Sequence, residues 1–255
     1  MTYAISGAAS PLTHVSIFGV EVENVDKPEA IALMEDLIRG PYRYTHRVSF
    51  VNAHTLNYAV EQPDFKQILN DSTYVFGDGT GVRWSAKVRG VTMKDNLVGT
   101  DLIPEFFDAT ANKGYRYFLL GADAATIRKA ARYAATQFPG WDLVGFHHGY
   151  LTNEQLTEAA IAKINQAQPH VLLVGMGNPI QERWIHRHRN DLYVPLAMGV
   201  GGLFDHWGGN LKRAPLWVRK LGFEWLQLLS QQPHKWKRYI PGNAKFLARM
   251  ILIKN

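Results

Sequence analysis

The sequence predicts an α/β protein, with a mostly parallel sheet that carries helices on both faces and a basic helical appendage at the C-terminus. Three observations lead to this prediction. Short apolar runs typical of buried strands alternate with segments of helical periodicity. Several of these runs end in turns that contain glycine or asparagine. The charge of the chain also changes sharply after residue 205. Alternating strands and helices indicate a parallel sheet, because each connection must cross back over it.

The first elements follow a leader, residues 1–13, that we expect to be flexible. Residues 15–22 predict a strand or tight hairpin. Asp26 is placed to cap a helix over residues 28–39, since proline stands at its first position. The next predicted elements are a strand at 47–51, a helix capped by Asn52, a short helix from Pro63, a central strand at 74–76 and a helix from Gly99.

The second half of the chain continues the same alternation. The wholly apolar run at 171–174 is the kind of strand that is buried on both faces. Thr152 and Gln155 have the spacing of a capping box for a helix to about residue 166. The other predicted elements are strands at 115–120, 143–147 and 194–198, and helices at 124–138 and 178–189. We therefore expect a Rossmann-like catalytic core at 14–205 and an appendage at 206–255.

Composition excludes several classes of protein. The 255 residues include no cysteine, so disulfides and thiolate metal sites are absent and a reducing compartment fits. No apolar run approaches the roughly 18 residues that span a bilayer, and the N-terminus lacks the pattern of a signal peptide. We expect a protein of the cytoplasm or of a membrane surface.

The most informative stretch is residues 74–82, where an apolar run ends in a turn with three glycines and a helical pattern follows. Glycines let the backbone bend sharply and approach a ligand closely. Asp78 is the one ionisable residue of this turn, and open α/β sheets place their chemistry at such strand ends. The alternative is that Asp78 only caps the following helix.

A second turn of the same kind covers residues 175–184. Gly177 permits close approach of a ligand, and Asn178 with the helix N-terminus offers donors to an anion such as a phosphate. Gln181 is placed to bind a sugar hydroxyl or a carbonyl. The alternative is a capped helix with Gln181 in solvent. Because parallel strands end at one edge of a sheet, a single crevice is expected to gather Asn52, Asp78, Tyr150, Gln181 and Asp205.

The sequence lacks the signatures of common cofactor sites. Its glycine turns match neither the dinucleotide pattern nor the triphosphate-binding loop, which ends in Gly-Lys-Ser/Thr. His147 and His148 are adjacent, and His186 and His188 are two apart on a predicted helix, so both pairs diverge. We expect neither a cofactor nor a catalytic metal.

The appendage, residues 206–255, is strongly basic and rich in tryptophan. It holds ten Lys or Arg against one acid, Glu224, and four of the seven tryptophans of the chain. Basic side chains among tryptophan and leucine fit an anionic membrane surface or a phosphate-rich ligand. Nucleic-acid binding is the rival interpretation, but no helix-turn-helix, zinc finger or RNP-like strand supports it. An ordinary packed helical extension is the plainest alternative.

Together these motifs resemble the WecG/TagA/CpsF glycosyltransferases (glycosyltransferase family 26). The resemblance rests on sequence stretches in family order through most of the chain, at 76–82, 149–150, 175–184, 199–205, 213–215 and 224–226. It implies transfer of a sugar from a UDP-sugar to a polyprenyl-diphosphate-linked sugar, with inversion and without a metal, at the cytoplasmic face of the plasma membrane. The enzyme would be a peripheral membrane protein of surface polysaccharide synthesis.

The resemblance also implies roles for particular residues. Asp78 takes the place of the general base that removes the proton of the acceptor hydroxyl, and Gln181 that of an active-site glutamine near the donor sugar. Asn52, Tyr150 and Asp205 match positions of the donor pocket. The remaining residues expected to bind substrate are Gly177 and Asn178 at the second turn, and Arg213, Lys235 and Arg238 in the appendage.

The chain departs from the family pattern at three places: Phe50 replaces a frequent threonine, Leu228 an arginine and Lys235 another arginine. These changes leave open the contacts of the appendage and the identity of both sugars, with N-acetylmannosamine, its uronic acid and glucose all occurring among relatives. Self-association also stays open. The alternative function is that of a non-catalytic, membrane-associated protein that binds nucleotide sugars.

Overall fold

The computed structural model describes residues 12–215, 218, 224–231 and 236–253. It contains an eight-stranded sheet in the order β1-β2-β4-β3-β8-β7-β5-β6. The strands are β1 His14–Ile17, β2 Val20–Glu23, β3 His46–Val51, β4 Tyr74–Gly77, β5 Arg116–Gly121, β6 Asp142–His147, β7 Val171–Gly175 and β8 Leu196–Gly199. Only the β1–β2 hairpin is antiparallel. The predicted α/β class and mostly parallel sheet are confirmed.

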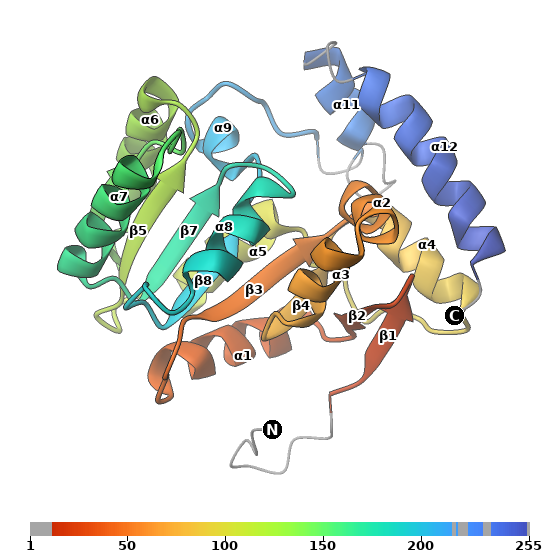
Figure 1. Ribbon diagram of the computed structural model, residues 1–255, viewed down its shortest axis with the longest axis horizontal. Coiled ribbons are helices and arrows are strands. Elements are labelled where there is room, and N and C mark those ends of the chain that lie inside the picture. The colour runs from red at the N-terminus through yellow and green to blue at the C-terminus, as the bar shows by residue number, and fades with distance from the viewer. Residues whose placement is uncertain (1–11, 216–217, 219–223, 232–235, 254–255) are drawn as a thin grey trace.

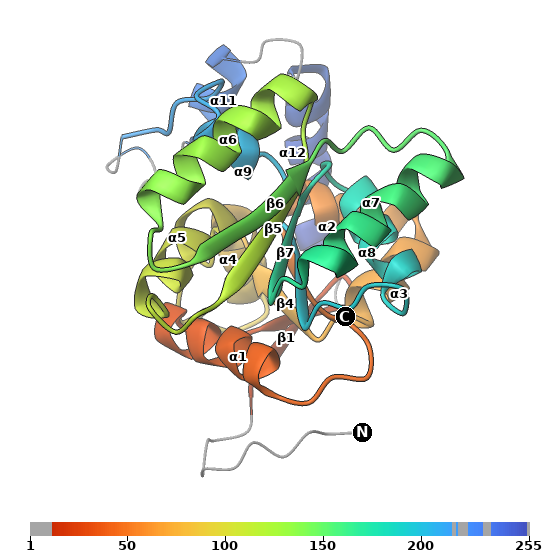
Figure 2. The same ribbon diagram turned by 90° about the vertical axis from the view of Figure 1, so that its left-hand side faces the viewer.

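Helices connect the strands and cover both faces of the sheet (Figure 1). They are α1 Lys27–Arg39, α2 Ala53–Glu61, α3 Pro63–Asn70, α4 Thr80–Val88, α5 Gly99–Ala109, α6 Ala124–Gln137, α7 Glu154–Ala167, α8 Ile180–His188, α9 Leu203–Trp207, α11 Glu224–Gln231 and α12 Trp236–Leu252. In Figure 2 the strands β5 and β7 run between α6 on one side and α7 on the other.

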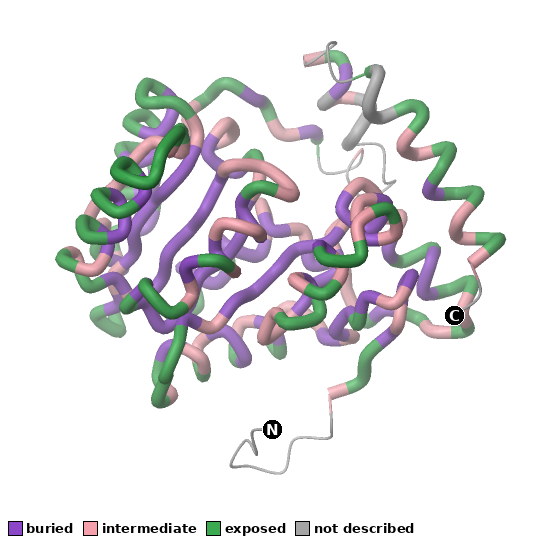
Figure 3. The backbone as a smooth tube through the Cα atoms, viewed as in Figure 1, coloured by how far each residue is buried: buried purple, intermediate pink, exposed green. Residues whose placement is uncertain are grey.

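The core is divided by the alternation of side chains along each strand. Tyr117 and Leu119 of β5 face α1, α5 and α6, whereas Phe118 and Leu120 face α7 and α8. A third cluster lies on the same side as α7, where α2, α3 and α4 cover β1, β2 and part of β4. Figure 3 shows the strands as the most continuously buried part of the chain. Burial on both faces explains why these strands are apolar runs.

The neighbouring strands β3 and β8 lie at the point where the two halves of the sheet meet. The chain builds one side of the sheet with β2 and β4 and the other side with β5, β6 and β7. In open α/β sheets such a meeting point opens a crevice at the carboxyl ends of the strands, where ligands bind. Asn52 and the loop after Gly199 leave the sheet at that point.

Two local predictions are corrected, and a third, the strand or tight hairpin at residues 15–22, is confirmed as a hairpin. The N-cap of α7 is Asn153, whose Oδ1 accepts a hydrogen bond from Leu156 N at 2.8 Å, so Thr152 does not cap this helix. Asparagine fills the same role as threonine there, one residue later. The strand at Tyr74–Gly77 is third from one edge, with β3 and β8 at the centre. Residues 15–22 form a hairpin, whose turn residues Phe18 and Gly19 have φ of 56° and 78°.

The last helix of the chain returns to its N-terminal half. Helix α12 packs against α2 and α4, and Phe246 is 2% exposed, with its ring 5.6 Å from that of Phe18. Arg249 on the same helix donates to Asn57 O and Oδ1 in α2. The division of the chain at residue 205 stays a prediction. Among the residues that the structure describes, no helix is both long and apolar enough to cross a membrane.

Candidate active site

Polar residues follow the parallel strands at one edge of the sheet. Asn52 comes directly after β3 and Asp78 directly after β4, and the backbone N–H of Asp78 donates to Val51 O at 2.8 Å. The loops after β7 and β8 are joined in the same way, with Val200 N donating to Val174 O at 2.8 Å. The other predicted site residues of the core at this edge are Tyr150, Gly177, Asn178, Gln181 and Asp205. These residues follow parallel strands of one sheet, whereas the crevice that would gather them and their chemical roles stay predictions.

The turn after β4 leaves Asp78 half-buried at the start of α4. The N-cap residue of this helix is Gly79, which has no side chain, so Asp78 is not the residue that caps α4. Gly79 has a φ of 98°, which favours glycine, and a Cβ placed there would point into open space. The turn therefore leaves open space beside Gly79, the residue that follows Asp78.

The loop 91–98 holds the Asp78 turn in place. Asn96 Oδ1 accepts a hydrogen bond from Gly79 N at 2.7 Å, and Leu97 N donates to Gly77 O at 3.0 Å. These two contacts flank Asp78 on both sides in the sequence. The sequence analysis missed Asn96, and we find no local pattern that would have revealed it, because its partner lies 17 residues away.

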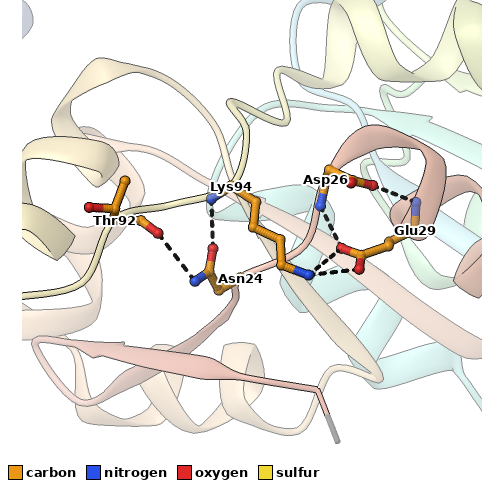
Figure 4. A network of polar contacts seen from close by, with 5 residues as sticks. All are labelled: Asn24, Asp26, Glu29, Thr92 and Lys94. Atoms are coloured by element: carbon orange, nitrogen blue, oxygen red, sulfur yellow. Dashed lines mark hydrogen bonds and ion pairs between the residues drawn. The ribbon is translucent and has the colours of Figure 1, made fainter. Parts of the chain in front are cut away.

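The same loop is anchored to the start of α1 (Figure 4). Lys94 Nζ lies 2.7 and 2.9 Å from the two carboxylate oxygens of Glu29, and Lys94 N donates to Asn24 Oδ1 at 2.8 Å. Glu29 and Asp26 form the capping box of α1. The side chain and backbone of Lys94 thus connect a helix cap to the loop that supports the Asp78 turn.

Asn52 has the capping role that the sequence suggests. Its Oδ1 accepts hydrogen bonds from His54 N at 3.0 Å and from Thr55 N at 3.2 Å, and Thr55 Oγ1 also lies 3.3 Å away. With Oδ1 directed at α2, a ligand contact of Asn52 would have to use its amide nitrogen.

Gln181 is buried and joins two turns. Its Oε1 accepts hydrogen bonds from Gly177 N at 3.1 Å and from Gly201 N at 3.0 Å, while its Nε2 donates to Glu182 Oε1 at 2.8 Å. Only 1% of the residue is exposed, so the alternative of a solvated Gln181 is wrong. The side chain holds the turn after β7 against the turn after β8.

Glu182 is a buried carboxyl group that the sequence analysis did not single out. It is 3% exposed and also accepts a hydrogen bond from Asn178 Nδ2. Burial raises the pKa of Glu182 to about 7 despite the opposing effect of these hydrogen bonds. Glu182 stands three residues before Ile185 and six before His188, so the three share one side of α8, and all are buried. This spacing in the sequence could have indicated that Glu182 faces the core.

Three further predicted site residues of the core, Tyr150, Gly177 and Asp205, differ in their exposure and contacts. Tyr150 is 66% exposed, and Gly177 has a φ of 82° with open space where a Cβ would stand. The carbonyl of Asp205 accepts from Asn210 N and Leu211 N, which holds the chain after α9.

Three basic residues of the appendage are predicted to bind substrate, and the structure describes them to different extents. Arg213 Nη2 donates to Asp101 Oδ1 at 2.7 Å, which ties the appendage to the first turn of α5. Arg238 lies on α12, but its side chain is outside the described part of the structure. Lys235 lies outside the described residues altogether. Within the described ranges, no three His, Asp or Glu side chains gather into a metal-binding group.

Comparisons with known proteins agree with the resemblance. The model of the glycosyl transferase WecG/TagA/CpsF family matches residues 15–255. A Bacillus subtilis (strain 168) protein named N-acetylglucosaminyldiphosphoundecaprenol N-acetyl-beta-D-mannosaminyltransferase is 30% identical over 193 residues, covering 76% of this chain and 74% of that protein. Proteins of the same name from Bacillus spizizenii (strain ATCC 23059 / NRRL B-14472 / W23), 31% identical over 71% of this chain and 70% of that protein, and from Staphylococcus aureus (strain NCTC 8325 / PS 47), 30% identical over 83% and 82%, are also similar.

Proposed function

The chain belongs to the WecG/TagA/CpsF family of glycosyl transferases, and from this premise we propose that it moves a sugar from a UDP-sugar to a polyprenyl-diphosphate-linked sugar. N-acetylmannosamine is the donor sugar that the relatives' names favour, and N-acetylglucosamine on a polyprenyl diphosphate the acceptor. The observation that carries the proposal is the family match across residues 15–255 together with the half-buried Asp78 at the carboxyl edge of the sheet.

In the proposed reaction, a hydroxyl oxygen of the acceptor sugar attacks the anomeric carbon of the donor. The new carbon–oxygen bond forms as the bond to the UDP oxygen breaks on the opposite face, which inverts the configuration. Asp78 takes the hydroxyl proton, a task that needs a carboxylate within hydrogen-bond reach of that hydroxyl. The position of Asp78 at a strand end, with open space beside Gly79, supports this role.

The departing UDP carries a developing negative charge that the protein must stabilise. We propose that backbone N–H groups of the turn at Gly177 and basic side chains of the appendage do so without a metal. Arg213 is held at the first turn of α5 by its hydrogen bond to Asp101. Asn52, Tyr150 and Asp205 would complete the donor pocket, and Lys235 and Arg238 would approach the diphosphate of the acceptor.

The acceptor is a lipid, so the enzyme must work at a membrane surface. We propose that it does so as a peripheral protein on the cytoplasmic face of the plasma membrane, where UDP-sugars are available. The exposed apolar residues of α12, among them Trp236, Leu247 and Ile251, support membrane contact by the appendage.

UDP release tests the proposal directly. The protein is incubated with a panel of UDP-sugars in EDTA, with and without a short-chain polyprenyl-diphosphate-linked N-acetylglucosamine or glucose. Acceptor-dependent release from one donor is the expected result, and its persistence in EDTA would support a metal-free mechanism. Measurable UDP binding with no release from any pair would contradict the proposal and favour a binding protein.

A further inference from the structure

Helix α4, directly after the Asp78 turn, exposes apolar and basic side chains together. Trp84 and Val88 are 52% and 58% exposed and stand four residues apart, so they form a stripe along the helix. Arg83 and Lys87 are exposed beside them, and neither makes an ion pair within the described part of the chain. Helix α4 contains no acidic residue. The opposite side of the helix, with Val82, Ser85 and Ala86, is buried.

Helix α12 extends this stripe. The two helices lie side by side (Figure 1), and a Cβ at Gly81 would stand 3.2 Å from the ring of Phe246. The spacings of four, seven and four residues place the exposed apolar residues of α12 on one side of the helix. These residues are Trp236, Ile240, Leu247 and Ile251.

Two basic residues on the other side of α12 form ion pairs with α2. Lys245 and Arg249 pair with Glu61 of α2 at 2.5 and 2.9 Å. Because α2 lies on that side, the outer apolar stripe faces away from it. Helix α12 also contains no acidic residue.

An apolar groove joins the two helices. It has a volume of about 450 Å³. Its lining consists of residues at the ends of α4 and α12 and on β1: Val88, Arg89, Val91, Met250, Ile251, Ile253, His14, Val15 and Ser16. Arg89 Nη2 donates to Ile253 O at 2.9 Å, which fixes the end of α12 beside the end of α4. The groove is the place where the exposed residues Val88 of α4 and Ile251 of α12 come together.

We propose that this α4–α12 surface seats the catalytic core itself on an anionic bilayer leaflet. A helix with exposed tryptophan and aliphatic residues, flanked by basic residues and free of acids, has the chemistry of interfacial membrane binding. Arg83 and Lys87 meet the anionic headgroups, and the groove takes up lipid acyl chains. The surface thereby extends beyond the appendage to the helix that carries the Asp78 turn.

The position of α4 gives the surface a functional consequence. The helix begins two residues after Asp78 and, at 1.5 Å per residue, the stripe ends only about 12 Å from that turn. Seating α4 on the leaflet therefore brings the crevice to the level of the headgroups, where a lipid-linked diphosphate would be presented. This consequence rests on the proposed function, whereas the membrane contact does not.

The absence of cysteine makes a direct test possible. Single variants Val88→Cys, Leu247→Cys and, as a control on α6, Tyr133→Cys are labelled with an environment-sensitive fluorophore. All three positions are exposed in the structure. With phosphatidylglycerol-containing vesicles, labels at 88 and 247 are expected to shift to the blue and the label at 133 to stay unchanged. A response at 247 without one at 88 would overturn the proposal, since the appendage alone would then touch the membrane.

Charge and apolar variants sharpen the test. Arg83→Gln and Lys87→Gln are each expected to weaken binding to anionic vesicles by about fivefold, since a basic residue near such a surface contributes about 1 kcal/mol. The matched control Lys129→Gln, exposed on α6, should bind as the wild type does. Trp84→Ser is expected to weaken binding about tenfold. Wild-type binding by all three α4 variants would overturn the proposal.

The assay uses vesicles without either substrate. A protein that binds vesicles through α4 but releases no UDP would contradict the proposed function and leave the surface intact. A protein that has full transferase activity but whose α4 label does not respond to vesicles would support the proposed function and contradict the α4–α12 membrane surface. If the label at 88 responds to protein concentration alone, the surface is an interface between two copies and the proposal is wrong.

Discussion

The turn after β4 and the turn after β7 read alike in the sequence but differ in the structure. Each follows a buried strand, contains several glycines and leads into a helix. The first keeps Asp78 half-buried beside open space. The second buries Gln181 and Glu182 to 1% and 3% exposure and directs Gln181 at backbone groups. The difference separates the residue that we propose to meet a substrate from residues that hold two turns together.

The comparison predicts its largest effect at Asp78. Asp78→Asn is expected to lower kcat by about 10²–10⁴, because an amide cannot take the proton of the acceptor hydroxyl. The variant should still fold, since the turn is also held by the backbone of Asp78 and by Asn96. UDP release and thermal unfolding measure the two effects. Asp108→Asn, an exposed change on α5, is the control, and full activity of Asp78→Asn would remove Asp78 as the base.

The second effect concerns Gln181. Gln181→Leu leaves the N–H groups of Gly177 and Gly201 without their acceptor, which is expected to cost about 2–4 kcal/mol of unfolding free energy. Urea unfolding compares it with Gln137→Leu, an exposed change on α6 that should be near neutral. Its predicted role beside the donor sugar is tested separately by kcat of the folded fraction. An unchanged kcat would leave Gln181 with a structural role only. Wild-type stability would show that Gln181 does not hold the two turns together.

The third effect is a pH dependence of stability. Burial raises the pKa of Glu182 from 4.5 to about 7, so between these values the folded protein holds a proton that the unfolded chain has lost. The contribution of Glu182 to the free energy of unfolding should therefore fall as pH rises through this window, by up to about 3 kcal/mol. Urea unfolding at pH 5 and pH 8 measures the fall.

Glu182→Gln keeps an oxygen acceptor for Asn178 and Gln181 and removes the titration. About half of the fall should disappear in this variant. The other half should remain, because burial also raises the pKa of Glu23 from 4.5 to about 7. An unchanged pH dependence would show that Glu182 is not the group responsible.

The smallest effect is expected at Asn96. Asn96→Ala removes one hydrogen bond to the Asp78 turn, which corresponds to about 1 kcal/mol, or about a fivefold loss of kcat. Asn96→Asp retains an oxygen acceptor for Gly79 N and should recover part of the loss. Lys94→Ala, farther along the same loop, removes an exposed ion pair and should matter less. Equal kcat for Asn96→Ala and the wild type would separate this loop from the function of Asp78.

Much of the fold could be predicted because its signals are local. Apolar runs, helix caps at Asp26 and Asn52, and glycines at strand ends depend on residues a few positions apart. Those signals also place Asn52, Asp78 and Gln181 at one edge, since parallel strands end together. The cap of α7 was misplaced by one residue because Thr152 and Asn153 both have side chains that can cap a helix.

The sequence by itself determined the fold class, the set of strand-end residues and the family, because these follow from periodicity and from motifs within short segments. Only the tertiary structure decided which of those residues are buried. Gln181 meets Gly201 across 20 positions, Asn96 meets Gly79 across 17, and α12 packs against α2 and α4 from the far end of the chain. Such contacts depend on how separate elements come together in space, and no local pattern records that.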